Sequence, residues 1–289
     1  MHKIVKMLKA TDDVYTMEFE ASRIAKAFKP GQFVILRVHE KGERVPFSIC
    51  DVNKEKGTIT VVFRKVGETT EYMSKLKSGK FILDAAGPLG QPSQLLKMKD
   101  ASNEKVLFIS EDSASIRIYT ELKYLHDNNV HADALLSFKN KDRLMFKEEI
   151  SKAADKTYIS FEDGKEEYDG SIEKVTKHIL EHEAYTLVVC MGSPLMMKKV
   201  CEVTKEKNIK TIVSLNVLML DGTGICGACR VSVGSEIKFA CEDGPEFDGH
   251  LVDFDEVMIR QKVYSNPEAR KKYKEQHAGN EAAVEKEGC

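Results

Sequence analysis

Three cysteines near the C-terminus have the type and spacing of metal ligands. Cys226 and Cys229 form a C-x-x-C loop between glycines, and Cys241 returns from a short predicted hairpin. This pattern is typical of an iron–sulfur site, because thiolates ligate the iron and glycines let backbone amides approach the sulfide atoms. A fourth cysteine is missing from the group. A structural zinc site with Asp221 as its fourth ligand is the alternative.

A second set of residues, Arg44 to Ile49, suits a flavin. Arginine can bind a phosphate, the flat edge of a strand can lie against the isoalloxazine ring, and the Ser48 hydroxyl with backbone amides can bind the polar rim of that ring. Further along, Gly67 to Thr70 leads into a predicted helix. The N-terminus of that helix could hold a pyrophosphate through backbone N–H groups and a threonine hydroxyl. Each motif alone is equally typical of an ordinary edge strand or N-cap.

The composition indicates two medium-sized cores. The chain has 289 residues, of which 42% are hydrophobic and 31% charged, so we expect two domains and an appendage. The 44 basic residues nearly balance the 46 acidic ones, which gives no electrostatic reason to expect binding to nucleic acid or to a membrane.

The sequence has no apolar N-terminal segment and no window near the ~20 apolar residues of a membrane span, which predicts a cytoplasmic location. In a reducing compartment the seven cysteines suggest metal before disulfides.

The strands and helices that must position these residues show two patterns of apolar and polar residues. Short alternating strands separated by Gly and Pro predict an antiparallel barrel with one helix; the strands are expected at 16–20, 32–38, 44–50, 57–63 and 81–84, and the helix at 69–77. Apolar runs that alternate with charged helices then predict a doubly wound α/β domain; its strands are expected at 105–109, 132–138, 157–161, 186–191 and 211–215, and its helices at 116–127, 171–182 and 194–207.

We therefore divide the chain into four parts. The first is an antiparallel flavin-binding β-barrel over 1–97, and the second is a nucleotide-fold α/β domain over 98–212. A 2Fe-2S cluster-binding segment over 213–262 follows, and then a charged helical or disordered tail over 263–289. The tail is rich in Lys, Glu and Gln, which favours solvation over a packed core.

The order of the barrel motifs resembles the ferredoxin-NADP reductase superfamily. Arg-x-Pro-Phe-Ser-Ile is followed by Gly-x-x-Thr-x-x-Met and then by Gly-Pro-Leu-Gly. The resemblance implies an FAD bound by Arg44, Pro46, Phe47, Ser48, Ile49, Gly67 and Thr70. Family members often have a second glycine where this chain has Thr69, so the pyrophosphate turn that includes Thr69 is altered.

The cluster loop resembles one family more closely. Asp-Gly-Thr-Gly-x-Cys-Gly-x-Cys-Arg, followed by Phe-Ala-Cys-x-Asp-Gly-Pro-Glu-Phe-Asp-Gly-His, is similar to the small subunit of NADH-dependent reduced ferredoxin:NADP oxidoreductase, also known as sulfide dehydrogenase. The family is related to the dihydroorotate dehydrogenase electron-transfer subunit, whose loop begins with Cys. The resemblance implies a 2Fe-2S cluster held by Asp221, Cys226, Cys229 and Cys241. It also implies a large flavin and iron–sulfur subunit as partner in a heterodimer or larger complex, with ferredoxin as a further candidate partner.

The resemblance fails at one turn. Relatives have a pattern like Gly-Gly-Gly-x-Gly-x-Ala-Pro after the first strand of the second domain, where this chain has Ser110 to Arg117 without a glycine. We therefore expect a degenerate NAD(P) site and an electron-transfer subunit with no catalytic residue of its own. In one alternative, Ser113 and Ser115 hold the nucleotide and the chain oxidises NAD(P)H. In another, the chain is a non-catalytic cluster-binding scaffold or redox sensor.

Overall fold

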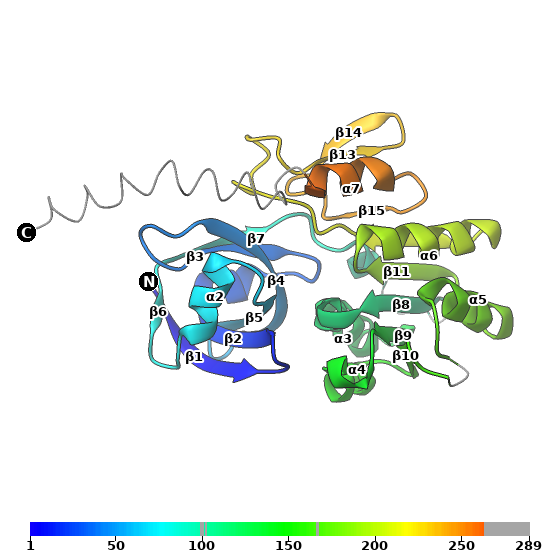
Figure 1. The fold of residues 1–289 in the computed structure, drawn as a ribbon, viewed down its shortest axis with the longest axis horizontal. Helices are drawn as coiled ribbons and strands as arrows, with labels where there is room; N and C mark the ends of the chain where they lie inside the picture. The colour runs from blue at the N-terminus through cyan, green and yellow to red at the C-terminus, as the bar shows by residue number, and fades with distance from the viewer. Residues whose placement is uncertain (99–100, 102, 166–167, 263–289) are drawn as a thin grey trace, which may run out of the picture.

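The computed structural model of the chain describes residues 1–98, 101, 103–165 and 168–262. The predicted charged tail, 263–289, lies outside the described residues. Figure 1 shows a barrel, an α/β domain beside it, and a C-terminal segment that lies against both. In the part of the chain that the structure describes, no helix is both long and apolar enough to cross a bilayer.

The N-terminal part forms a nearly closed antiparallel barrel, as predicted. Its seven strands follow the order β6-β1-β2-β5-β4-β3-β7; they are β1 (His2–Lys9), β2 (Val14–Glu20), β3 (Phe33–Arg37), β4 (Arg44–Asn53), β5 (Thr58–Arg64), β6 (Phe81–Ile82) and β7 (Asp84–Leu89). Successive side chains of β2 point alternately into and out of the barrel, so that Met17 and Phe19 are buried in its core and Glu20 is exposed to solvent. This is the period-two pattern of a half-buried strand.

Three barrel elements were not predicted. Strand β7 continues to Leu89, beyond the predicted strand end at residue 84. Strand β1 has Val5 and Leu8 exposed to solvent, so its sequence lacks a clear alternation of apolar and polar residues. Helix α1 (Ser22–Ala27) is only six residues long, which is too short for a helical period to emerge. The predicted helix is present as α2 (Glu68–Lys75), and the prediction of a single helix in the barrel was wrong.

The second domain is a six-stranded sheet of order β10-β9-β8-β11-β12-β15. Five strands are parallel, at the predicted places: β8 (Lys105–Glu111), β9 (His131–Phe138), β10 (Thr157–Phe161), β11 (Leu187–Met191) and β12 (Lys210–Ser214). Successive residues of β8 face opposite sides of the sheet and both sides are buried, which explains the continuous apolar run. This confirms the doubly wound fold.

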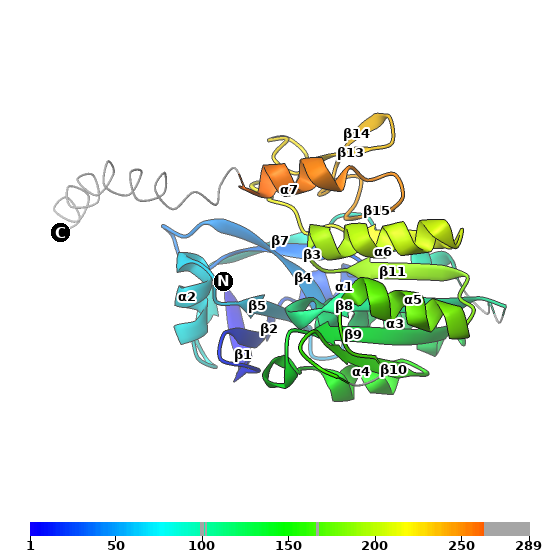
Figure 2. The same cartoon turned by 45° about the vertical axis from the view of Figure 1, so that its right-hand side comes forward.

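Helices cover both faces of this sheet (Figure 2). One face packs against α5 (Ile172–His182) and α6 (Pro194–Glu206), and the other against α3 (Tyr119–Asp127) and α4 (Lys147–Ala153). The start of the helix predicted at 116–127 is a 3-10 helix, η2 (Asp112–Ile118), which continues into α3. Shorter 3-10 turns are η1 (Gln94–Lys97) and η3 (Lys141–Arg143).

The C-terminal segment is built into the rest of the molecule. It contains a hairpin of β13 (Arg230–Val233) and β14 (Glu236–Phe239), and helix α7 (Phe254–Lys262). Between them, β15 (Glu246–Asp248) pairs antiparallel with β12 and completes the α/β sheet. The segment therefore joins the α/β domain through its sheet, and Gln91, which follows the barrel strands, donates to its Glu242 carbonyl.

Candidate functional site

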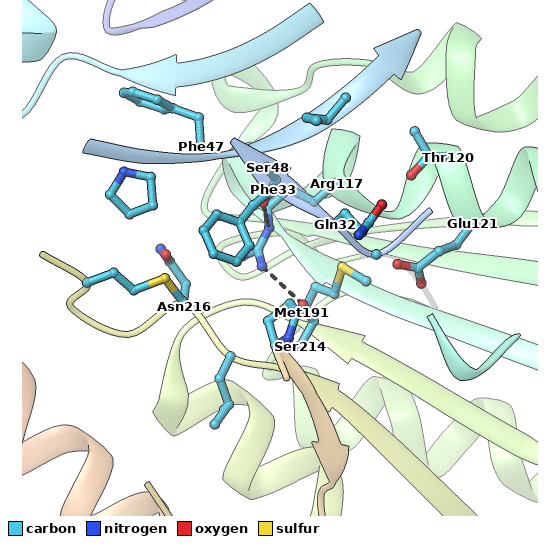
Figure 3. Close-up of a pocket in the computed structure, with 16 residues that line it drawn as sticks. Gln32, Phe33, Phe47, Ser48, Arg117, Thr120, Glu121, Met191, Ser214 and Asn216 are labelled. Carbon is cyan, nitrogen blue, oxygen red and sulfur yellow. Dashed lines mark hydrogen bonds between the residues drawn. The ribbon is translucent and has the colours of Figure 1, made fainter. Parts of the chain in front are cut away.

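A pocket lies where the barrel, the α/β domain and the C-terminal segment meet (Figure 3). The barrel contributes Pro46 to Ile49 from β4 and Phe33 from β3. The α/β domain contributes residues from η2, α3 and the ends of β11 and β12. The chain that leaves β12 adds Leu215, Asn216 and Met219. Four of the predicted flavin residues, Pro46, Phe47, Ser48 and Ile49, thus share one pocket.

Arg117 crosses this pocket from the second domain to the barrel. Its Nε donates to Ser48 Oγ at 3.1 Å and its Nη2 donates to Ser214 Oγ at 3.3 Å; both bonds are drawn in Figure 3. Among the described residues, no carboxylate lies within 4 Å of its guanidinium as an ion pair. Sequence reasoning missed Arg117, although it ends the altered turn that had been singled out. Its hydrogen bonds are to hydroxyl groups, and the buried Glu121 lines the same pocket without forming an ion pair with it, so the guanidinium can also bind an anionic or strongly polar ligand there.

The other predicted flavin residues lie outside the lining of this pocket. Arg44 is exposed at the start of β4 and its Nη1 lies 3.7 Å from Asp84 Oδ2. Gly67 and Thr69 lie at the N-terminus of α2 beside the buried Thr70. The Thr70 hydroxyl accepts the backbone N–H groups of residues 66 and 67 and donates to the Gly67 carbonyl. The Thr70 hydroxyl therefore shapes the turn at the start of α2.

The candidate cluster ligands lie on one loop and one hairpin. Cys229 and Cys241 are buried with their Sγ atoms 3.2 Å apart, and Cys226 is exposed on the loop. Backbone amides point at sulfur: the Gly224 N–H donates to Cys241 Sγ at 3.1 Å. Amide donors to sulfur are characteristic of iron–sulfur sites.

The Asp221 carboxylate is held in place by the same loop. Its Oδ1 accepts the Thr223 N–H at 2.8 Å and its Oδ2 accepts the Cys226 N–H at 2.7 Å. These bonds to the charged form hold the pKa of Asp221 below its ordinary value. Gly222 and Gly224 take the left-handed conformation, with φ of +74° and +81°. Among the described residues, no three His, Cys, Asp or Glu side chains converge on a site for a single metal ion. The donor types, three thiols, an ionised carboxylate and amides directed at sulfur, are those that suit a 2Fe-2S cluster.

Comparison with known proteins identifies the family. Residues 216–253 match the iron–sulfur cluster binding domain of dihydroorotate dehydrogenase B. A Thermotoga maritima protein described as a homolog of the electron transfer subunit of dihydroorotate dehydrogenase B (NAD(+)) is 35% identical over 93% of each chain. This chain belongs to the family of dihydroorotate dehydrogenase B electron-transfer subunits. A Clostridium beijerinckii relative, an uncharacterized protein in the adh 3′ region, is 41% identical over 93% of each chain.

Solved structures agree with this family. A chain in the structure of NADH-dependent reduced ferredoxin-NADP oxidoreductase, studied for flavin-based electron bifurcation, is 33% identical with a TM-score of 0.87, over 96% of this chain and 98% of that one. The ferredoxin NADP+ reductase of Neisseria gonorrhoeae, with bound FAD and NADP, is 16% identical with a TM-score of 0.58, over 71% of this chain and 89% of that one. The latter likeness concerns the fold. The predicted resemblance is confirmed.

The chain has an unusual turn after β8. Asp112 adopts a left-handed backbone with φ of +44°, a conformation that glycine adopts without strain. The Glu111 carboxylate accepts the backbone N–H of Ser193, in front of α6. Of the two serines in this turn, Ser115 is fully buried and Ser113 is partly exposed. An acidic side chain thus occupies the space between the turn and the Gly192-Ser193-Pro194 loop.

Proposed function

We propose that this chain is the electron-transfer subunit of an oxidoreductase complex, with FAD in the barrel pocket and a 2Fe-2S cluster in the loop from Asp221. One observation carries the proposal: the pocket and the cluster loop share a wall. Met219 lines the pocket two residues before Asp221. A Cβ on Gly222 would lie 2.3 Å from Ile35 Cδ1 of β3, so the loop lies directly on the barrel. Flavin and cluster would therefore be close enough to exchange electrons without a mobile carrier.

The FAD would lie along β4. Ser48 and Arg117 would face the polar edge of the isoalloxazine, and Phe47 would fix the strand by its burial in the barrel core. Arg44 and the N-terminus of α2, from Gly67 and Thr69, would bind the phosphates. When bound, the flavin accepts two electrons and one proton and can release the electrons singly. Asp221, Cys226, Cys229 and Cys241 would hold the cluster.

We propose further that the nucleotide site is degenerate. A dinucleotide pyrophosphate carries two negative charges and needs close backbone approach at the turn after the first strand. Here the carboxylate of Glu111 is bound to the Ser193 amide, and a second carboxylate, on Asp112, follows it. Repulsion from these groups and the missing glycines oppose binding. Electrons would then enter and leave through the cluster and a partner protein.

The surface around the cluster loop supports a protein partner. Ile225, next to Cys226, is 89% exposed, and Ile237 at the hairpin is 66% exposed. Leu220 is also exposed. Exposed apolar side chains beside a redox centre favour docking of another redox protein. We expect the large flavin and iron–sulfur subunit there, with ferredoxin as the second candidate.

An anaerobic titration of the reconstituted chain tests this function. We expect one FAD and one 2Fe-2S cluster by absorbance, both reduced by a one-electron donor such as reduced ferredoxin. NADH and NADPH should leave the flavin oxidised. A chain without flavin absorbance after reconstitution would rule out the electron relay, and rapid flavin bleaching at submillimolar NADH or NADPH would establish the NAD(P)H-oxidising alternative. Stoichiometric zinc without iron would favour the structural zinc site.

A further inference from the structure

Two buried glutamates meet behind the pocket. Glu121 of α3 is 1% exposed and Glu246 of β15 is 7% exposed. Their side chains lie within hydrogen-bonding reach of each other. Glu121 Oε2 and Glu246 Oε1 are shielded from solvent, and neither receives a hydrogen bond from a conventional donor among the described residues. Two carboxylates in this contact cannot both be ionised, so one proton must lie between them.

The surroundings decide which glutamate carries the proton. Glu246 Oε2 accepts the Ser93 hydroxyl at 3.1 Å and the Gln94 N–H at 3.0 Å. Burial raises the pKa of Glu246 above its ordinary value, and these two donors partly offset that effect by favouring the ionised form. Glu121 has no such donors, and burial together with the neighbouring Glu246 raises the pKa of Glu121 well above its ordinary value. Glu121 is therefore the protonated member of the pair.

One cation faces the pair. Arg117 acts on Glu121 from η2, and the remaining neighbours from η1 are the uncharged Ser93 and Gln94. Behind Arg117, burial raises the pKa of the Cys50 thiol on β4 to about 12, so this thiol stays neutral. The group of Arg117, Glu121 and Glu246 thus has one positive and one negative charge and holds one proton.

This group is open to the pocket. Glu121 lines it together with Arg117 and Thr120, as Figure 3 shows. Arg117 and Glu121 are four residues apart on the continuous η2–α3 segment, so they lie on one side of it. Arg117 in turn binds Ser48, which would face the flavin edge. The proton is therefore held at the pocket wall.

We propose that Glu121 and Glu246 form a proton-holding pair that protonates the flavin when it is reduced by one-electron donors. The inference rests on the proposed FAD site. A hydride donor would deliver two electrons and a hydrogen together, whereas a cluster delivers electrons alone. Two electrons from reduced iron–sulfur centres and one proton convert FAD to its singly protonated reduced form. Glu121 would supply this proton from its O–H group when FAD is bound, and solvent would return a proton to the pair. Arg117 is a positioning residue, because its positive charge compensates the negative charge of Glu246.

Infrared spectroscopy tests the pair independently of the flavin chemistry. The oxidised, reconstituted chain at pH 8 should show the C=O stretch of a protonated carboxylic acid, shifted in D2O. Glu121→Gln should abolish this band, and the exposed Glu181→Gln should leave it unchanged. Flavin absorbance, measured on the same samples, reports separately whether the proposed FAD site exists. A wild-type chain without the acid band would overturn the inference even if FAD is bound.

Kinetics test the transfer itself. We expect Glu121→Gln to retain FAD but to slow protonation of the reduced flavin by roughly 100-fold, the usual contribution of a general acid. Proton uptake would be followed with an indicator dye after rapid mixing with a one-electron reductant. Glu121→Asp, which keeps an acid, should restore part of the rate. An unchanged rate in Glu121→Gln, with the acid band lost, would show that the pair exists but does not protonate the flavin.

Discussion

Replacing Glu121 by glutamine should change how the stability of the protein depends on pH. In the unfolded chain this carboxyl has its ordinary pKa, 4.5, whereas burial beside Glu246 raises the pKa of the folded form. Between these two values the folded state binds one proton more than the unfolded state. The free energy of unfolding of the wild type must then fall as pH rises, by about 1.4 kcal/mol per pH unit, until the folded pKa is passed.

Replacing Glu121 by glutamine removes this proton. The free energy of unfolding should then no longer fall with pH on account of residue 121. The Glu121→Gln variant should therefore gain stability relative to the wild type as pH rises from 5.5 to 7.5, by at most about 1.4 kcal/mol per pH unit and only up to the folded pKa. The amide can also donate to Glu246, so the variant should fold. The measurement is urea unfolding of the full chain without cofactors, under reducing conditions, followed by far-ultraviolet circular dichroism at three pH values in this range.

The surface variant Glu181→Gln provides the control, because its side chain is exposed on α5. The free energy of unfolding of this variant should change with pH in the same way as that of the wild type. If the curves of wild type and Glu121→Gln run parallel, the two glutamates do not share a proton at neutral pH, and the argument from their burial is wrong.

Three further predictions concern the cofactor sites. Arg44→Ala should weaken FAD binding by one to two decades in Kd, because a charge-assisted phosphate contact contributes about 1.5 to 3 kcal/mol; fluorescence titration of the apoprotein measures this, and unchanged affinity would remove Arg44 from the site. Asp221→Cys should keep the cluster and change its reduction potential, whereas Cys226→Ala should lose it; redox titration and iron analysis distinguish these outcomes from a zinc site. Glu111→Gly combined with Asp112→Gly should allow flavin reduction by NADH or NADPH, since it removes two negative charges and restores backbone freedom; continued inertness in stopped-flow mixing would show that the turn is not the obstacle.

The sequence alone determined the features that depend on local spacing. The period of two in the barrel strands and the buried apolar runs of β8 and β11 predict both domains, because these patterns follow from which face of a strand is covered. The cluster loop is equally local. Asp221, Cys226 and Cys229 lie within nine positions of one another, so residue type and spacing suffice to propose their chemistry.

Only the tertiary structure decided which distant residues share the pocket. Arg117 meets Ser48 and Ser214 because the second domain packs against β4. Glu121 meets Glu246 because β15 crosses back to pair with β12. No periodicity in the sequence encodes such a meeting, since a glutamate in an amphipathic helix is normally at the surface. The proton between these carboxyls exists because packing excludes the water that would otherwise keep both ionised.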